Sequence, residues 1–363
     1  MLATGVQVNK AVVTEAATVP VLSHGGLVLP AVTVETYNEE LRDEEGFVGD
    51  RASGRAFRAI LDDWRERVRE QGEDPFGDTP TREISKSKLD KMLAGADPMA
   101  AGLVHTAVEE FACELATVVR RFLRLDGWKG TERIVIGGGL IASHIGELAM
   151  GRAAVMLAGE GLEIELHAIQ NHPDEAGLIG AVQLAPSWIL AGHDAILAAD
   201  IGGTNMRVGV VKLNMSKKGD LSKAAVAKFL HWRHADDKPS REEAVNRLAQ
   251  MIEELVVYAA DEKLKLAPFL GIGCPGLIDD HGSIVTGGQN LPGNWEGEGF
   301  NLAASLSALL PRIGGHEIVA VVHNDAVVQG LSEVPRMADV HHWGVLTIGT
   351  GLGNAAFTNR ERE

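Results

Sequence analysis

The feature that most constrains this chain is an apolar run that ends in an aspartate and two glycines. Residues 197–205 read LAADIGGTN, a pattern typical of a buried strand that turns sharply into a second one. Two later segments repeat the pattern of a strand and a small-residue turn, VVHNDA at 321–326 and TIGTGLG at 347–353. Ligand chemistry in α/β proteins is concentrated at strand ends of this kind.

Helical and strand patterns alternate over the middle of the chain. RIVIGG at 133–138 predicts a buried strand, 143–157 a helix, 162–169 a strand and 175–185 a helix, which is α/β organisation. Before them, residues 53–71 carry helical spacing with Ser53 as the expected N-cap. A long amphipathic helix over 99–125 is expected to place Cys113 in the core.

Composition narrows the class of protein. A chain of 363 residues fits two domains better than one. A net charge of −16 argues against nucleic acid as a partner. No run approaches the roughly 20 apolar residues of a membrane span, and the N-terminus lacks the pattern of a signal peptide. With only two cysteines, no zinc site is expected, and the chain is predicted to be cytoplasmic.

The turn after Asp200 predicts a phosphate site. Glycines let backbone N–H groups approach an anion without a Cβ in the way, and Thr204 can add a hydroxyl donor. Asp200 would repel a phosphate, so its expected partner is Mg²⁺. The candidate phosphate ligands are Gly202, Gly203, Thr204 and Asn205. The alternative is a tight β-hairpin in which the aspartate caps the turn.

Two other strand ends carry candidate residues. Gly349, Thr350 and Gly351 could form a second phosphate turn, or an ordinary hairpin. Asp325 follows a buried strand and precedes a helix, where a carboxylate can accept the proton of a substrate hydroxyl during phosphoryl transfer. The alternative role for Asp325 is that of a helix N-cap.

A rival interpretation rests on residues 137–142, which read GGGLIA. They satisfy the spacing Gly-x-Gly-x-x-Ala after a strand and before a helix, and Glu163 or Glu165 could supply the acidic residue of a Rossmann site. The protein would then be an oxidoreductase. A lone match of this kind is weak, and it leaves the other glycine turns and Asp325 unexplained.

Taken together, the motifs resemble those of sugar kinases of the actin/hexokinase superfamily, and most closely the ROK family. The segments that carry the resemblance are DIGGTNMRVGVV, the Pro-Gly turn in GIGCPGLID, the loop NLPGNW, VVHNDA, TIGTGLG, SGRAF, IVIGGG and EAGLIGAVQLA. In the usual family order DIGGTN comes first and the GGG strand last. Here residues 1–185 resemble the last part of the family's chain and residues 196–363 its first part, which indicates a circular permutation joined through PSWILAGHD at 186–194.

The resemblance implies a fold and a reaction. We expect two ribonuclease H-like domains flanking a cleft, one from 196–322 and a larger one from 1–185 completed by 323–363. The implied activity is ATP- and Mg²⁺-dependent phosphorylation of a hydroxyl of a hexose or hexose derivative, as in glucokinases. The expected partners are a small-molecule sugar and a second copy of the chain. Gly138 and Gly139 would pack against adenosine, and Asn290, Asn324 and Asn294 would contact sugar hydroxyls.

The chain departs from the family in two places. Residues 28–31 read VLPA where the family carries a Glu-x-Gly-His sugar-binding box, and the nearest histidine is His24. Residues 43–50 contain no cysteine where the family has its zinc box. The alternative to an active kinase is therefore a nucleotide- or sugar-binding relative that has lost turnover.

Overall fold

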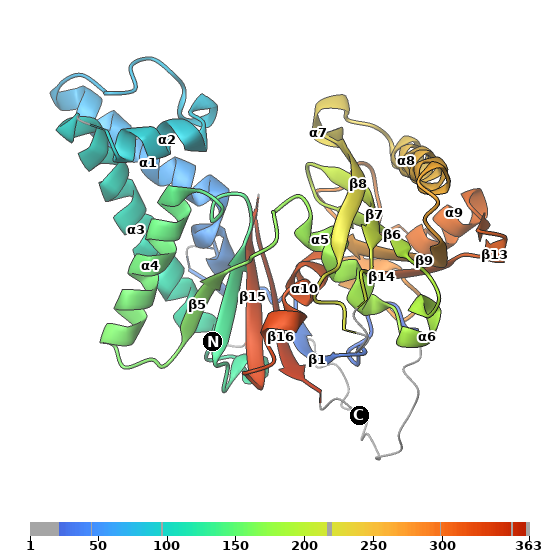
Figure 1. Ribbon diagram of the computed structural model, residues 1–363. Helices are drawn as coiled ribbons and strands as arrows, with labels where there is room; N and C mark the ends of the chain where they lie inside the picture. Colours follow the sequence, from blue (N-terminus) through green and yellow to red (C-terminus); the bar gives the residue numbers. More distant parts are fainter. Residues whose placement is uncertain are drawn as a thin grey trace.

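The computed structural model describes residues 22–360 except 45, 96, 216–219, 298 and 350. Two five-stranded sheets stand side by side, and the short helices α5 (Ala176–Gly180) and α10 (Asp325–Leu331) lie between them (Figure 1). The Val- and Thr-rich pattern of residues 6–34 predicts short strands, and its part up to residue 21 lies outside the described part of the chain.

The first sheet has the strand order β1-β16-β15-β4-β5. Its strands are β1 (Val32–Tyr37), β4 (Arg133–Gly137), β5 (Glu165–Ala168), β15 (His342–Ile348) and β16 (Leu352–Asn359). The helices on one face are α1 (Gly54–Gln71), α2 (Lys86–Leu93), α3 (Pro98–Phe122) and α4 (His144–Gly159). Alternate residues of β4 serve the two faces, since Ile134 and Ile136 pack among these helices while Val135 packs on the other side.

The second sheet has the strand order β14-β9-β6-β7-β8. Its strands are β6 (Ala195–Ile201), β7 (Met206–Lys212), β8 (Ala225–Trp232), β9 (Leu266–Cys274) and β14 (Val319–Asn324). The helices α8 (Arg241–Asp261) and α9 (Leu302–Leu309) pack on one face, where Leu197 and Leu248 share a core. Ile196, on the opposite face, packs in the core that includes Leu178 of α5.

The two sheets have the same topology when the first is followed from β15. The order β6, β7, β8, β9, β14 and the order β15, β16, β1, β4, β5 each place the strands as third-second-first-fourth-fifth. In both sheets the second strand is antiparallel to its neighbours, while the first, fourth and fifth are parallel. Each sheet is therefore of the ribonuclease H type, and the predicted actin/hexokinase-like fold class is confirmed.

The helix α5 belongs by packing to the second sheet. It contacts β6, β7, β8 and β9 as well as α10. Residues 176–180, which precede the predicted boundary at residue 185, therefore pack on the sheet built from 195–324. The physical reason is that the apolar side chains of α5 are buried between the two sheets.

The shorter elements lie outside the two five-stranded sheets. They are β2 (Arg42–Asp43), β3 (Gly46–Phe47), α6 (Ser187–Leu190), α7 (His234–Asp237), β10 (Leu277–Ile278), β11 (Ile284–Thr286), β12 (Arg312–Ile313) and β13 (His316–Glu317). Ser53 caps α1 as predicted, because its side chain accepts the N–H of Ala56. The prediction for Cys113 was wrong, since it is exposed on the side of α3 that faces away from the core.

No helix within the described part of the chain is both long and apolar enough to cross a membrane.

Candidate active site

Asp325, the predicted general base, and Asp200, the predicted magnesium ligand, both lie where parallel strands of the second sheet end. Asp200 is the penultimate residue of the central strand β6 and is in register with Gly273 of β9, and His323 of β14 is in register with the same glycine from the other side. Asp325 follows β14 directly and begins α10. Two interstrand spacings separate the strands that carry these carboxylates, about 10 Å in all.

Asp200 is buried against an arginine that the sequence did not single out. Its carboxylate Oδ2 accepts a hydrogen bond from Arg207 Nη1 at 3.4 Å. Arg207 Nε and Nη2 also donate to Asp174 Oδ1, at 3.0 and 2.6 Å. Burial raises the pKa of Asp200, while the positive charge of Arg207 opposes that rise. Arg207 therefore holds the strand end against the loop that precedes α5.

The register of the hairpin could have revealed Arg207. Asp200 and Arg207 are directly opposite each other across the β6–β7 pair, so the length of the turn alone places them together. Asp174 had no such signal, because it is distant in sequence and no spacing connects it to the hairpin.

A glycine of α5 sets how closely that helix approaches Asp200. A Cβ built on Gly177 would lie 2.6 Å from Asp200 Cγ and 2.7 Å from its Oδ1. Only a residue without a side chain fits there.

Gly177→Ala is expected to lower the free energy of unfolding by about 1–3 kcal/mol, because both partners are buried and one must shift. Urea unfolding measures the change. Gly102→Ala is the matched control, since Gly102 lies in α3 with nothing within 4 Å of a built Cβ, and it should be neutral or stabilising. Equal stability of the two variants would contradict the close packing of α5 on Asp200.

Asp325 is not the N-cap of its helix. That role belongs to Asn324, whose Oδ1 accepts the N–H groups of Ala326 and Val327 at 3.0 and 3.3 Å. Asp325 Oδ1 accepts the N–H of Ala326 at 2.9 Å, and the side chain keeps partial solvent access. Burial, with a smaller contribution from the charge of Asp200, raises the pKa of Asp325 to about 7. A carboxyl group with such a pKa can exchange a proton near neutral pH.

The first glycine turn is a tight hairpin that two histidines contact, one at its backbone and one at the Asn205 side chain. Gly202 N–H donates to Asn205 O at 2.8 Å, and His234 Nε2 lies 2.9 Å from Gly202 O. His231 Nε2 lies 2.9 Å from Asn205 Oδ1. Residues 202–205 are all half-buried, so the turn is held in one shape while part of it stays accessible.

This turn contacts the loop that was predicted to bind sugar. A Cβ on Gly203 would lie 2.7 Å from Asn290 Cβ, so only glycine allows the hairpin and the loop to approach this closely. The structure thus brings together Gly203 and the exposed Asn290.

The second glycine turn reaches the start of α10. Gly349 N–H donates to Gly351 O at 2.9 Å, and Gly349 O accepts the N–H of Gly54 at 3.1 Å. A Cβ on Gly353 would lie 2.9 Å from Ala326 Cβ, so the strand that leaves the turn packs next to Asp325. Thr350, the predicted hydroxyl donor of this turn, lies outside the described residues.

Gly138 and Gly139 lie beside the second turn. Gly138 has a φ of 103°, and a Cβ on it would overlap the carbonyl oxygen of Ile348. Lys86 Nζ donates to Gly139 O. The turn that contains Gly138 therefore packs against the end of β15, which leads into the second glycine turn.

The helix N-terminus that would bind the pyrophosphate in the oxidoreductase alternative already contacts a carboxylate. In a Rossmann site the pyrophosphate binds at the N-terminus of the helix that follows the glycines. Here that helix is α4, and Asp90 of α2 already occupies its first turn, since Asp90 Oδ1 accepts the N–H of Ile145 at 3.0 Å. A second negative charge at this position would be repelled.

The three predicted sugar-contacting asparagines differ in their surroundings. Asn324 is buried, and its amide is committed to backbone groups, with Nδ2 donating to Gly276 O at 3.0 Å. Asn294 is exposed, and its Oδ1 accepts the N–H of Glu296 at 3.0 Å. Asn290 is exposed beside Gly203. Of the three, Asn290 is placed best to meet a ligand at the first turn.

The segment in place of the family's zinc box is held by ion pairs. Asp43 pairs with Arg51 at 2.7 Å and with Arg121 of α3 at 3.1 Å. Among the residues that the structure describes, no group of three or more His, Cys, Asp or Glu side chains is arranged to hold a metal ion. Charged contacts therefore fasten this segment to the helices.

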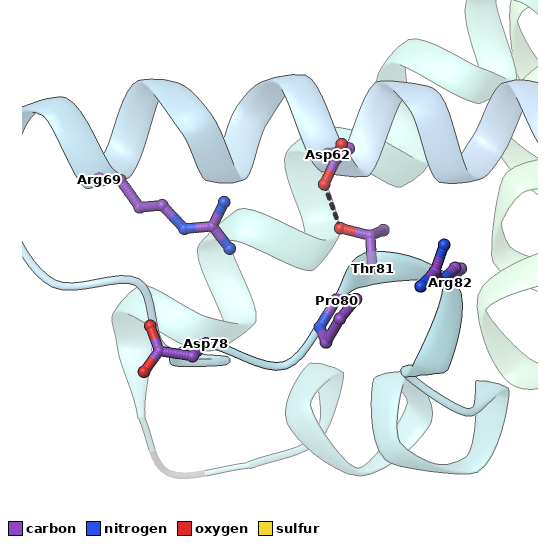
Figure 2. Close-up of a pocket in the computed structure, with 6 residues that line it drawn as sticks. All are labelled: Asp62, Arg69, Asp78, Pro80, Thr81 and Arg82. Atoms are coloured by element: carbon purple, nitrogen blue, oxygen red, sulfur yellow. Dashed lines mark hydrogen bonds between the residues drawn. The ribbon is translucent and has the colours of Figure 1, made fainter.

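Surface hollows lie away from the two carboxylates. One of about 590 Å³ lies between α1 and the segment that leads to α2, and it is lined by Asp62, Arg69, Asp78, Pro80, Thr81 and Arg82 (Figure 2). Another of about 420 Å³ is lined by residues from Asp279 to Asn301, including Glu296 and Phe300. Neither is lined by Asp200 or Asp325, so catalytic chemistry is not assigned to either hollow.

A magnesium ion with a nucleotide phosphate fits the Asp200 end of the site better than a metal held by protein alone. Asp200 is the carboxylate of β6 at the turn, and half-buried glycine backbone adjoins it. Mg²⁺ is usually bound through one or two carboxylates, with phosphate oxygens and water completing its shell. A site with one protein carboxylate next to a glycine turn matches that preference.

The two ribonuclease H-type sheets, with carboxylates at the ends of β6 and β14, define a two-domain α/β protein of the actin/hexokinase type. Residues 196–362 match the model of the ROK family. Over these residues the chain is similar to the ROK family, which confirms the predicted resemblance there.

Similar proteins cover about half of the chain. A glucokinase from Thermotoga maritima is 28% identical over 164 residues, which are 45% of this chain and 44% of the glucokinase. A solved candidate sugar kinase from Cytophaga hutchinsonii is 20% identical with a TM-score of 0.35, over 46% of this chain and 48% of its own. A solved candidate N-acetylmannosamine kinase from Listeria monocytogenes is 26% identical with a TM-score of 0.30, over 46% and 47%. The chain thus spans about half the length of the relatives that it matches.

Proposed function

We propose that this protein is a phosphotransferase that moves the γ-phosphate of ATP to a hydroxyl of a hexose or hexose derivative. The observation that carries the proposal is the state of Asp325. Asn324 performs the capping, and the pKa of Asp325 lies at about 7 on a carboxyl group with solvent access. A general base works best when its pKa is close to the working pH.

The glycine turns are the proposed phosphate ligands. Backbone N–H groups of residues 202–205 and 349–351 would surround the β- and γ-phosphates, and Gly138 and Gly139 would pack against the adenosine. Asp200 would hold Mg²⁺, which neutralises developing charge on the phosphate oxygens when it is bound. Arg207 keeps the Asp200 carboxylate in place.

Asp325 is the proposed acceptor of the sugar hydroxyl proton. Its charged form is needed for that role, so the rate should rise as pH increases through the pKa of the group. The charge of Asp200 contributes to the high pKa, so both carboxylates shape the pH response. Asn290, next to Gly203, is the proposed contact to a sugar hydroxyl.

A second candidate function is nucleotide or sugar binding without turnover. It is favoured by residues 28–31, which read VLPA in place of the family's sugar-binding box, and by the exposed apolar side chains of Leu27 and Val28. His24 does not replace the missing histidine as a free side chain, because its Nδ1 accepts the N–H of Val322 at 3.1 Å.

The test is ADP release from Mg²⁺-ATP in the presence of hexoses, amino sugars and their N-acetyl forms. Sugar-dependent ADP release that requires Mg²⁺ is the expected result, and it would identify the acceptor at the same time. ATP binding, seen as a raised melting temperature, without turnover on any sugar would favour the binding function instead.

A further inference from the structure

One buried histidine next to the catalytic carboxylate has no role in the proposed chemistry. His323, the penultimate residue of β14, is fully buried. Its Nδ1 accepts the N–H of Asn324 at 2.8 Å, and its Nε2 lies 3.1 Å from Gly26 O. A neutral imidazole has one acceptor and one donor nitrogen, so these contacts place the proton on Nε2, which donates to Gly26. Burial lowers the pKa of His323 to about 4, which keeps the ring in this state near neutral pH.

Gly26, the partner of His323, belongs to a segment that covers β14, one of the two edge strands of the second sheet. Gly25 N–H donates to Val322 O at 3.0 Å, and Val322 N–H donates to His24 Nδ1 at 3.1 Å. Residues 24–26 thus satisfy polar groups that an edge strand would otherwise leave open. Gly25 has a φ of 55°, and a Cβ on it would overlap Ile278 O, so the segment is closely fitted.

The other sheet also reaches His323. The ring of Tyr37, at the end of β1, lies edge-on to the His323 ring with centroids 5.2 Å apart. Its hydroxyl donates to Ile278 O at 3.2 Å and accepts the N–H of the same residue at 3.4 Å. His323 is therefore enclosed by groups from both halves of the molecule.

We propose that His323 is a positioning residue that fixes the orientation of Asp325 by anchoring Asn324 to the segment 24–26. This inference rests on the proposed function. The contacts run in sequence: Gly26 fixes the ring, the ring accepts the N–H of Asn324, and the Asn324 side chain caps Ala326 and Val327. The Asp325 carboxylate accepts the N–H of the same Ala326.

Through His323, the segment 24–26 contributes to catalysis. General-base catalysis needs the carboxylate to be placed within a fraction of an ångström, and a misplacement of about 1 Å can cost about 100-fold in rate. Loss of the ring would leave the buried N–H of Asn324 without its partner and loosen the first turn of α10.

Three substitutions separate the two hydrogen bonds. His323→Leu removes both. His323→Asn keeps an acceptor at the position of Nδ1, and His323→Gln keeps a donor that can reach Gly26. We expect His323→Leu to lower kcat by about 30- to 100-fold, with the KM for ATP within about 2-fold of the parent. Each amide variant should lower kcat by less than His323→Leu does.

The matched control is His342→Leu. His342 bridges Thr358 Oγ1 and Gly127 O at 2.9 and 3.2 Å in the first sheet, on strands that do not carry Asp325. It should lower stability while kcat per folded molecule stays within about 2-fold of the parent. A kcat for His323→Leu within the same range, or equal losses in all three His323 variants, would overturn the inference.

Amide hydrogen exchange tests positioning without relying on turnover. We expect exchange at residues 324–327 to rise about 10-fold or more in His323→Leu, while residues 195–201 stay as protected as in the parent. Unchanged exchange at 324–327 would overturn the positioning role. If the parent phosphorylates no sugar, the proposed function fails, and the exchange result still decides the role of His323.

Discussion

Asp325→Asn is expected to abolish sugar phosphorylation and, at the same time, to stabilise the folded protein at alkaline pH. An amide cannot accept the hydroxyl proton, and losing a general base costs about 100- to 10,000-fold in kcat. Binding of ATP should persist, because the proposed phosphate ligands are the backbone groups of the glycine turns and not the Asp325 carboxylate. Steady-state kinetics with the acceptor found in the sugar panel measures the loss. A variant that keeps more than about a tenth of the parent kcat would exclude Asp325 as the base.

The stabilisation follows from the raised pKa of Asp325. The pKa of Asp325 is about 7 in the folded protein, and its ordinary value, which applies to the unfolded chain, is 3.8. Between these two pH values the folded state therefore binds more protons than the unfolded state. Stability therefore falls as pH rises through that range, and above it the charged group costs up to about 4 kcal/mol, reduced by its partial solvent access.

The amide that replaces the carboxyl group in Asp325→Asn would carry no such charge. The variant should gain the most stability near about pH 8, and the gain should shrink toward about pH 5. Urea unfolding at both pH values measures it, with Asp261→Asn, an exposed site at the end of α8, as the control. A variant that is less stable than the parent at the higher pH would contradict the burial of a charged Asp325.

The strand ends were predictable because the sequence shows them directly. An apolar run that stops at Asp200 or at Asn324 places a polar residue where a buried strand ends. The register Asp200–Arg207 likewise follows from the hairpin alone. What the sequence did not show was the neighbours of these ends, such as Asp174, Gly26 and Tyr37, which come from distant segments.

The strand order was predictable only through the resemblance. The order in the structure agrees with the circular permutation that the resemblance indicated. The third strand of the first sheet, β1, precedes in the chain the strands β15 and β16 that come before it in the topology. A circular permutation explains this order, because reading the sheet from β15 reproduces the order of the second sheet. The permutation stays a prediction about the history of the chain.

The packing of α5 was missed for a physical reason. Residues 175–185 show an apolar pattern that predicts a helix, but a pattern does not reveal which sheet covers it. In the structure α5 lies against α10 and the second sheet, so a segment at the end of one half of the chain is buried by the other half (Figure 1). The small residues of this segment were the signal, since glycines inside a helix indicate a close approach.

Gly180→Ala should test that approach with a large effect on stability. Gly180 ends α5, and a Cβ on it would overlap the carbonyl oxygen of Val328 in α10. Both helices are buried between the sheets, so neither can move without disturbing the packing of Leu178 and Val345. A clash with backbone cannot be relieved by rotating a side chain, and we expect a loss of about 3 kcal/mol or more in the free energy of unfolding.

Gly151→Ala is the matched control for this substitution. Gly151 lies inside α4 with nothing within 4 Å of a built Cβ, so alanine there should stabilise the protein by up to about 1 kcal/mol. The comparison by urea unfolding separates the helical preference for alanine, which both sites share, from the contact between α5 and α10. If both variants were as stable as the parent, α5 and α10 could not be in contact through Gly180, and the two sheets would be joined in another way.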